Sequence, residues 1–536
     1  MKKVFYNGRI ITMDSGCPRA EALLVEGNKI SRVGNSEDML SLAEKSAERY
    51  DLEGKTVIPG LIDAHTHLFS YAMAKNLLDL SDMNSFGQAL SLIKERADNC
   101  KKGEWIVGRG WDQNRMRGFN GSVIGKLDKI FPENPVFLER VCGHAALVNS
   151  AALGKGSIES AAADPAGGEI KRDPAGRPTG LLIDKAADII RRIIPRITPE
   201  KEKELVGEAV NDCLAAGVTC VHDMSVNPES AAVYRELQEQ RRFPFRLYGY
   251  YLEDKIDFDN IADNDLLPEG GDENFSVQGV KFFTDGSLGA RSAALLEDYS
   301  DDKGNRGILT EDPETLSEKI LSCQRAGLQA AVHAIGDRAN RVVLDIFEKV
   351  NLFSPVAGRR HRIEHAQIIA PEDIDRFHAL SLIPSMQFVH CSSDMPWAES
   401  RIGFERLAGA YPWKSLVSSG CRIAGGSDMP VESINPFRGI YSAVTCRIRK
   451  GKRSKAGGDC DRRLSLPEAL ESFTLNAAYA SFREDLLGSL KAGKFADFII
   501  ISDNILEMPV EEIPMTAVLG TVQNGNIVHN SADWPF

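Results

Sequence analysis

The sequence predicts an α/β protein with a closed (β/α)8, TIM-like barrel, a small β domain formed by both termini and an inserted subdomain. Three observations support this prediction. Strand-like and helix-like segments alternate from about residue 200 onward. Both ends of the chain are rich in short strands separated by turns. Histidine, lysine and aspartate residues stand at the C-terminal ends of predicted strands, where the functional residues of a barrel collect.

The β domain is expected to combine residues 1–56 with residues 488–536. In the first part, Asn7-Gly8 and Glu26-Gly27-Asn28 are typical of hairpin turns between runs rich in valine and isoleucine. The second part has the same character. Its expected strands and turn are Ala496–Ile501, Ala517–Val522 and Gln523–Asn526.

The barrel is expected over residues 57–487, with residues 68–198 as an insertion. Its strands are near-continuous apolar runs, which are typical of a parallel sheet covered on both faces. The expected strands are the run at Val57, Val218–Asp223, Phe245–Leu252, Val277–Phe283, Gln329–Ala334, Arg362–His365 and Arg422–Gly425. The expected helices are Pro199–Gly217, Pro313–Ala326, Asp337–Val350 and Pro371–Leu380. The strand count approaches eight, which favours a closed barrel.

An open, doubly wound sheet is the alternative to the barrel. Such a sheet would carry a Gly-rich phosphate loop after its first strand, whereas this chain has His65-Thr66-His67 there. Within the insertion, Gly108–Asp112 and the Gly/Pro-rich stretch Asp164–Pro178 read as loops. We interpret the insertion as a lid or inserted subdomain over the barrel mouth.

Composition narrows the class of protein. The chain has 536 residues, of which 43% are hydrophobic and 26% charged, as in a soluble globular protein. Its net charge of -12 disfavours nucleic acid or an anionic membrane as a partner. The ten cysteines form no C-x-x-C pair, and no apolar run is long enough to span a membrane. We therefore expect a cytoplasmic protein with a small-molecule substrate, and a homodimer only as a base-rate expectation.

Two histidines end the first predicted barrel strand. The run Thr56–Ile62 is apolar and leads to Asp63-Ala64-His65-Thr66-His67. Alternate side chains of an extended strand point the same way, so His65 and His67 share one face and can bind one divalent cation. The pair alone is a weak signal, because two ordinary polar residues at a strand end give the same pattern.

Four further residues occupy the same position in other units. Lys281 and His333 lie near the ends of their predicted strands, His365 ends its strand, and Asp428 follows the last one. Each has an ordinary explanation: a snorkelling lysine, core histidines with satisfied hydrogen bonds, or an aspartate that caps a helix. Taken together, polar residues at so many apolar strand ends need a common reason, and a metal centre supplies one.

Several of these segments resemble a known family. Pro59–His67 is similar to the first-strand motif of the metal-dependent amidohydrolase superfamily. The runs Val280–Gly289, Val332–Asp337, Arg362–Gln367, Gly426–Val431, Cys142–Ser150 and Gly488–Asp497 resemble amidohydrolase family 3, most closely the branch that contains N-substituted formamide deformylase. The resemblance covers nearly the whole chain. It implies a (β/α)8 barrel, a β-sandwich formed by both termini, and zinc or a similar divalent ion.

The resemblance also implies a role for each candidate ligand. His65 and His67 would hold the more buried metal, and Asp428 would contact it and act as the catalytic proton shuttle. His333 and His365 would hold a second metal, and Lys281, carboxylated to a carbamate, would bridge the two. A one-metal site in which Lys281 is merely structural remains open. Arg291, His144 and Trp111 are tentative substrate-binding residues, with a structural salt bridge as the alternative for Arg291.

The function that these residues imply is hydrolysis of a non-peptide C–N bond by metal-activated water. The resemblance favours a small linear amide, such as an N-substituted formamide or an N-acyl amine. Deamination or cyclic-amide hydrolysis is the first alternative. A catalytically silent regulator that keeps the fold is the second.

Overall fold

The computed structural model describes residues 2–81, 83–98, 100–112, 116, 124–140, 145–159, 162–240, 243–258, 273–446, 462–532 and 534. It divides the chain into two compact units. The first unit combines Met1–Tyr71 with Val206–Phe536, and the second comprises Ala72–Leu205. The two crossings between the units lie within helices α2 (Leu68–Lys75) and α7 (Pro199–Ala215).

The first unit contains the predicted barrel, which the structure confirms. Eight strands pair side by side, each parallel to the next, in their order along the chain. They are β8 (Leu61–Thr66), β15 (Val218–Val226), β16 (Arg246–Leu252), β17 (Phe275–Phe283), β18 (Gln329–Ala334), β19 (Arg362–His365), β20 (Ile383–Met386) and β21 (Ala424–Gly425). Nearly every residue of these strands is buried, as a sheet covered on both faces requires.

Helices follow or lie between the barrel strands. They are α8 (Pro228–Glu239), α9 (Pro313–Arg325), α10 (Asp337–Phe353), α11 (Ile374–Ala379), α12 (Phe388–Arg406), α13 (Trp413–Ser418), α14 (Pro436–Thr445), α15 (Leu466–Ser472) and α16 (Leu475–Ala480). Several begin with side-chain caps. Asp312 caps α9 ahead of Pro313, and Ser465 forms a capping box with Glu468 at α15.

The barrel closes between its first and last strands. Thr66 and Met429 form a parallel bridge, the Asp428 N–H donates to the His65 carbonyl at 2.8 Å, and the His67 N–H donates to the Met429 carbonyl at 2.8 Å. These bonds join residues that the sequence places in the candidate site. The open, doubly wound alternative is therefore wrong, because its outer strands would not meet.

Two barrel strands differ from the sequence-based prediction. The run that begins at Val57 is two strands, because the chain changes sheets at Gly60 between β7 (Thr56–Pro59) and β8. Gly60 packs against Thr219 so closely that an added Cβ would lie 2.3 Å from its Oγ1. Strand β20 was not predicted, because Pro384 and Ser385 interrupt its apolar run.

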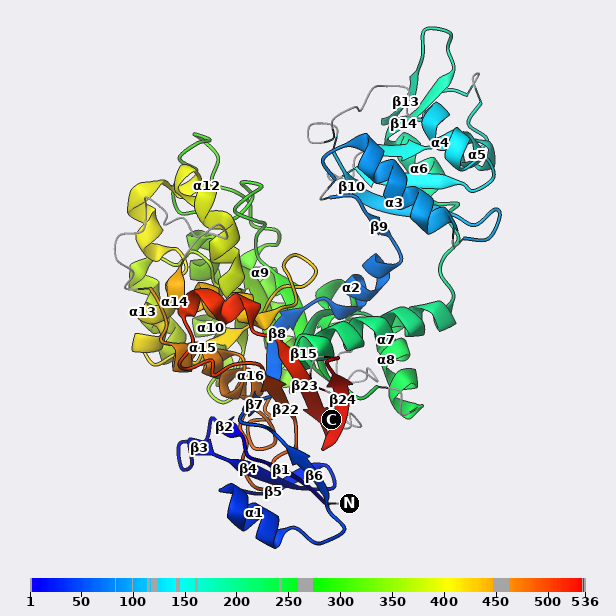
Figure 1. The fold of residues 1–536 in the computed structure, drawn as a ribbon. Coiled ribbons are helices and arrows are strands. Elements are labelled where there is room, and N and C mark those ends of the chain that lie inside the picture. The colour runs from blue at the N-terminus through cyan, green and yellow to red at the C-terminus, as the bar shows by residue number, and fades with distance from the viewer. Residues whose placement is uncertain are drawn as a thin grey trace. The chain divides into compact units, whose positions relative to one another are not determined.

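Two sheets at the ends of the chain pack face to face. One has the order β5-β4-β1-β6 and the other β24-β23-β22-β7-β2-β3. Their strands are β1 (Lys2–Tyr6), β2 (Arg9–Ile11), β3 (Arg19–Ala20), β4 (Ala22–Glu26), β5 (Lys29–Gly34), β6 (Glu48–Asp51), β7, β22 (Phe498–Ile501), β23 (Val518–Gln523) and β24 (Asn526–Asn530), with helix α1 (Ser36–Leu42). Phe5, Leu23, Val57, Phe498 and Val522 share their core. The N-terminal and C-terminal strands thus lie side by side (Figure 1).

Two of the turns predicted in this domain are confirmed, and one is wrong. The β4–β5 hairpin at Gly27 and the β23–β24 hairpin at Asn524-Gly525 are present. The hairpin predicted at Asn7-Gly8 is wrong, because β1 and β2 belong to different sheets. Gly8 instead makes a close approach to Leu52, whose Cδ1 would lie 2.5 Å from an added Cβ.

A buried ion pair joins the terminal sheets to the barrel. Arg246 on β16 donates from Nε to Asp497 Oδ2 at 2.6 Å and from Nη2 to Asn524 Oδ1 at 2.5 Å. Both partners of the ion pair are buried. Because removing one charge leaves the other buried and unpaired, this contact ties the two domains together.

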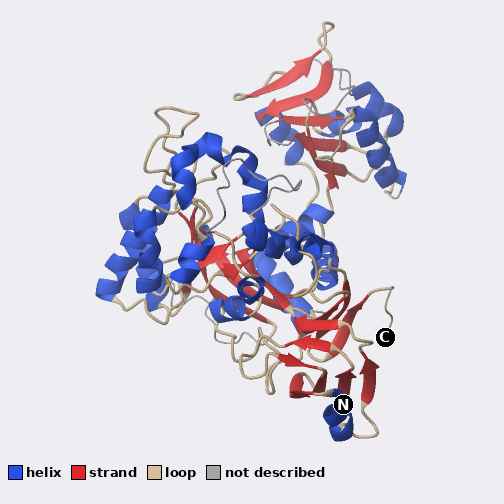
Figure 2. Ribbon diagram, turned by 60° about the vertical axis from the view of Figure 1, so that its left-hand side comes forward, coloured by secondary structure: helices blue, strands red, loops and turns tan. Residues whose placement is uncertain are grey.

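The second unit has a sheet of its own, shown in red in Figure 2, with the order β13-β14-β12-β11-β10-β9. Its elements are β9 (Leu78–Asp79), β10 (Ile106–Trp111), β11 (Val136–Arg140), β12 (Ala145–Val148), β13 (Gly168–Arg172), β14 (Pro178–Asp184), α3 (Phe86–Asp98), α4 (Ile124–Ile130), α5 (Ser150–Lys155) and α6 (Lys185–Arg191). The loop predicted at Gly108–Asp112 is wrong, since most of it forms β10. Glycine is needed at position 108 because Leu78 and Leu138 leave no room for a side chain. A search of the described residues for a helix long and apolar enough to cross a membrane finds none.

Candidate metal centre

The barrel brings the predicted ligands together at the C-terminal ends of its strands. His65 lies on β8, Lys281 on β17, His333 on β18 and His365 on β19. His67 directly follows β8, and Asp428 lies in the loop after β21. The ring centroids of His65 and His365 are 4.8 Å apart, and those of His333 and His365 are 4.6 Å apart. Side chains from strands far apart in sequence thus converge on one small volume.

A buried carboxylate sets the orientation of His65. His65 Nδ1 lies 2.5 Å from Glu364 Oε2, and both side chains are fully buried. Arg362 donates from Nε to the other Glu364 oxygen at 2.7 Å, so the carboxylate is paired on both sides. Despite burial, the charge of Arg362 and the hydrogen bond from His65 hold the pKa of Glu364 well below its usual value. An ionised Glu364 accepts the Nδ1–H of His65 and leaves Nε2 with a free lone pair.

His65 Nε2 is the atom best placed to bind a cation. This buried atom has no hydrogen-bond partner among the described residues. Burial, followed by the charge of Lys281, lowers the pKa of His65 to about 4, so the ring is neutral. A buried lone pair without a donor is costly unless a ligand occupies the space in front of it.

Asp428 faces the histidines from the opposite side of this space. Its Oδ1 lies 3.0 Å from His67 Nε2 and 3.5 Å from His65 Nε2. Burial favours the neutral acid, but the hydrogen bond from His67 outweighs it and holds the pKa of Asp428 well below its usual value. Asp428 is therefore an anionic oxygen donor directed at two imidazole nitrogens.

His365 and His333 form the second half of the cluster. His365 Nδ1 lies 2.6 Å from Gln387 Oε1, and burial and the nearby His333 hold the pKa of His365 well below its usual value. His333 Nε2 lies 3.3 Å from Asp285 Oδ1. Asp285 itself accepts the main-chain N–H groups of Ala294, Ile335 and Gly336 at 2.9–3.0 Å. These bonds fix the loop that supports His333.

Lys281 is buried within the barrel. It is 1% exposed, and burial lowers its pKa to about 8, against the opposing charges of Glu364 and Asp428. Its Nζ lies 5.3 Å from the centre of the Phe283 ring. The position is compatible with the predicted carbamate, because a largely apolar setting favours the neutral amine that such a reaction needs.

The backbone is strained at the same place. His365, Ala366 and Asp428 have φ values of +71°, +44° and +61°, a region that side chains rarely adopt. Positive φ at His365 also redirects its side chain relative to the regular alternation of β19. Strain of this kind is retained where the surrounding structure holds side chains for a function.

The donor set fits a divalent cation. One ligand atom each from His65, His365 and Asp428 lies within 4.8 Å of the others, and all three residues are buried. Two neutral imidazoles and a carboxylate suit zinc and similar ions. His67, which is 3.0 Å from Asp428, and His333, beside His365, add further donors at the edge of this group.

The three substrate-binding candidates stay predictions, and two of them have polar partners of their own. Arg291 pairs with Asp301 through Nε and Nη2, at 3.1 and 3.0 Å. Trp111 belongs to the second unit, where it is buried and donates from Nε1 to the Leu138 carbonyl at 2.7 Å. His144 lies outside the described residues.

Sequence reasoning missed two residues of the site. Glu364 was overlooked although it precedes His365, and a signal was present: Arg362 and Glu364 alternate on one strand and so share its inward face. His390 has no motif in the sequence that would mark it as part of a site. The structure places it on α12 beside His365, with ring planes 17° apart.

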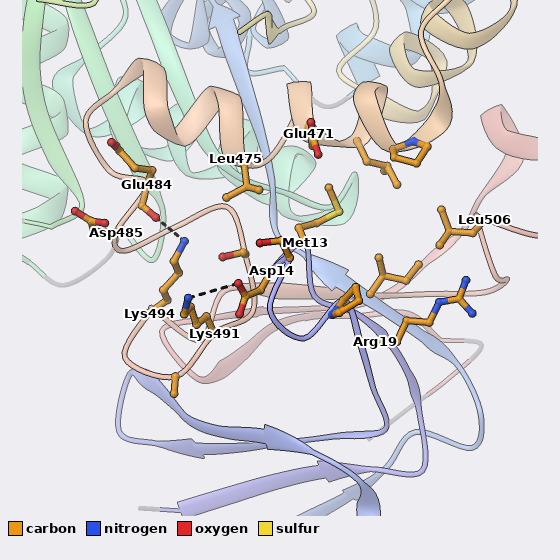
Figure 3. A pocket seen from close by; sticks show the side chains of 17 residues that line it. Met13, Asp14, Arg19, Glu471, Leu475, Glu484, Asp485, Lys491, Lys494 and Leu506 are labelled. Atoms are coloured by element: carbon orange, nitrogen blue, oxygen red, sulfur yellow. Dashed lines mark hydrogen bonds and ion pairs between the residues drawn. The ribbon is translucent and has the colours of Figure 1, made fainter. Parts of the chain in front are cut away.

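A cavity outside the candidate metal centre has a structural explanation. A cavity of about 690 Å³ lies at the seam of the terminal sheets and the barrel (Figure 3). Its lysines are already engaged. Lys494 donates to the carbonyls of Glu484 and Leu487 at 2.5 and 2.9 Å, and Lys491 Nζ lies 3.5 Å from Asp14 Oδ1. None of the candidate ligands lines it.

Comparison with known proteins supports a functional assignment. The profile of the amidohydrolase family matches residues 48–529. YtcJ of Bacillus subtilis is 33% identical over 540 residues, which cover 99% of this chain and 100% of that protein. N-substituted formamide deformylase of Arthrobacter pascens is 29% identical over 537 residues, covering 97% and 96%. A metal-dependent hydrolase from Pyrococcus furiosus superposes with a TM-score of 0.77 at 29% identity, covering 95% of this chain and 100% of its own.

Proposed function

The chain belongs to the amidohydrolase family and is a metal-dependent hydrolase of carbon–nitrogen bonds, and we propose that its substrate is a small linear amide. N-substituted formamides and N-acyl amines are the leading candidates. The observation that carries the proposal is the unpartnered Nε2 of His65, held toward Asp428 by Glu364. The similarity to N-substituted formamide deformylase supports the choice of a linear amide.

We assign the metal to the cluster around His65. In this proposal His65, His67 and Asp428 hold one divalent ion, with zinc the first choice. His333, His365 and a carbamylated Lys281 provide for a second. When bound, such an ion acts as a Lewis acid and makes water a nucleophile near neutral pH.

Asp428 is the proposed catalytic residue. Its carboxylate accepts a proton as water adds to the carbonyl carbon, and then delivers that proton to the leaving nitrogen. The C–N bond breaks, and the products are a carboxylic acid and an amine. The low pKa of Asp428 keeps the carboxylate ionised and ready to accept the proton.

The proposal is tested with a substrate panel. The zinc-loaded full-length enzyme is incubated with N-substituted formamides, N-acyl amines, cyclic amides and amino-substituted heterocycles, while carboxylate, amine and ammonia are measured. We expect amine and carboxylate from the linear amides. Ammonia from the heterocycles, or ring opening alone, would replace the linear amide with one of the alternatives. A complete lack of turnover would favour a silent regulator.

A further inference from the structure

His390 presents an unused hydrogen-bonding atom to the candidate centre. It lies in the first turn of α12, just after barrel strand β20. Its Nε2 is buried and has no hydrogen-bond partner among the described residues. The ring is stacked on His365, with centroids 6.1 Å apart. His390 is therefore held in place but its Nε2 contacts no hydrogen-bonding group of the described chain.

The two oxygens of Asp428 face different neighbours. Oδ1 is directed at His65 and His67, whereas Oδ2 lies 3.8 Å from His390 Nε2. This separation is too long for a hydrogen bond and too short for a water molecule directly between the atoms. With the ring proton of His390 on Nδ1, Nε2 is an acceptor, and a donor beside it can contact both Nε2 and Asp428 Oδ2 in a three-centre bond.

The scissile amide supplies such a donor when its nitrogen carries a hydrogen. We propose that His390 Nε2 accepts a hydrogen bond from the N–H of the scissile amide, and that the enzyme therefore selects amides with at least one hydrogen on that nitrogen. This inference rests on the proposed function and narrows its substrate class. Tertiary amides lack the donor and would leave the buried Nε2 of His390 unpaired.

The same contact orients the reaction. As water adds to the carbonyl carbon, the nitrogen becomes pyramidal and gains a localised lone pair. With its N–H directed at His390, the lone pair is free to face Asp428 Oδ2, which delivers the proton taken from water. The C–N bond then breaks and the amine leaves with that proton. His390 neither gains nor loses a proton in this sequence.

Three variants separate the acceptor from the ring. His390→Phe keeps the stacking on His365 but removes the nitrogen, and His390→Gln places a carbonyl oxygen near the Nε2 position. His378→Phe on the exposed face of α11 is the matched control. Each zinc-loaded enzyme is assayed with N-butylformamide and N-butyl-N-methylformamide, and its zinc content is measured.

We expect wild type to favour N-butylformamide by about 100-fold or more in kcat/KM. His390→Phe should lower kcat/KM for N-butylformamide by roughly 10- to 100-fold and leave kcat/KM for the tertiary amide unchanged. His390→Gln should retain most of the preference for N-butylformamide. Comparable wild-type rates on both amides, or equal losses on both in His390→Phe, would overturn the inference. So would loss of zinc from His390→Phe, which would make His390 a metal ligand.

A binding measurement keeps the inference apart from the proposed function. Metal-free wild type and His390→Phe are titrated with both formamides by ligand-observed NMR. Weaker binding of N-butylformamide to the variant, with unchanged binding of the tertiary amide, supports the His390 contact even if no amide is hydrolysed. Equal binding of both formamides by both proteins contradicts it.

Discussion

Glu364 and His65 form a buried pair in which Oε2 and Nδ1 are 2.5 Å apart, although the two residues belong to strands on different parts of the chain. Arg362 holds the carboxylate from the other side. The pair determines which nitrogen of His65 faces the candidate metal. A carboxylate that supports a ligating histidine typically changes metal affinity by 10- to 100-fold when it is removed.

Glu364→Gln should therefore weaken zinc binding by roughly 10- to 100-fold. The amide still accepts a hydrogen bond but loses the charge that makes His65 a better ligand. Zinc affinity is measured by competition with a chromophoric chelator, and thermal unfolding checks that the variant folds. Glu372→Gln, which alters an exposed partner of Arg341, is the control. Unchanged zinc affinity in a folded Glu364→Gln protein would remove Glu364 from the metal centre.

Asp428→Asn should retain metal but lose at least about 100-fold in kcat, since the amide cannot carry a proton from water to nitrogen. The assay measures kcat together with zinc content. Asp298→Asn, at an aspartate that pairs with Arg306 on the surface, serves as the control. Near-normal turnover in the Asp428 variant would exclude it as the proton shuttle.

Removal of the metal should abolish hydrolysis. Dialysis against a chelator leaves the folded chain without its Lewis acid, and added zinc or manganese should restore activity. Activity is followed together with metal content by mass spectrometry. Full activity in rigorously metal-free enzyme contradicts a metal-dependent mechanism for this chain.

Lys281→Ala should be inactive and should regain activity when acetate is added. A carbamate forms when a neutral amine adds to carbon dioxide with release of a proton, and its two oxygens are what acetate replaces. Lys281→Met fills the same space with an apolar chain and should resist rescue. Equal behaviour of the two variants with acetate would argue that Lys281 is structural.

His361 should make stability depend on pH. It is fully buried between the Ala330 N–H and Gln324, and burial lowers its pKa to about 3. The unfolded chain takes up a proton at this histidine below about pH 6.5, but the folded chain does not. The contribution of the buried, neutral ring to folding stability is therefore fully present above about pH 6.5 and is lost as the pH falls. Between pH 7.5 and 5 the loss is about 2 kcal/mol.

The check compares His361→Asn with wild type by denaturant unfolding at both pH values. Asparagine keeps an acceptor for the Ala330 N–H but does not titrate. The gap in stability between the two proteins should narrow at pH 5, whereas His378→Asn, on an exposed surface, should show no such change. A gap that is the same at both pH values contradicts this prediction.

Much of the barrel is predictable because each unit carries its own local signals. Strands Gln329–Ala334 and Arg362–His365 agree residue for residue with β18 and β19, since each is a short run that precedes a turn and a helix start. The division at Gly60 was hidden because β7 and β8 are equally apolar. Only the close contact with Thr219, from a distant strand, explains the break.

The site is predictable only where a strand end marks it. His65, His333 and His365 lie on predicted strands, and the barrel brings them together. Glu364 and His390 act through partners distant in sequence, so no local pattern reveals their contacts. The ion pair of Arg291 with Asp301 is also hidden from the sequence, since it depends on how one loop folds back on itself.

Strand β7 leads through Gly60 into the strand that carries His65, and its neighbour β22 is synthesised only after all eight barrel strands. During translation the nascent chain therefore presents an unpaired, apolar strand edge while the whole barrel is made. Exposed edges of this kind recruit other chains. Production of this protein in a foreign host should accordingly depend on chaperones that shield β7 until β22 emerges.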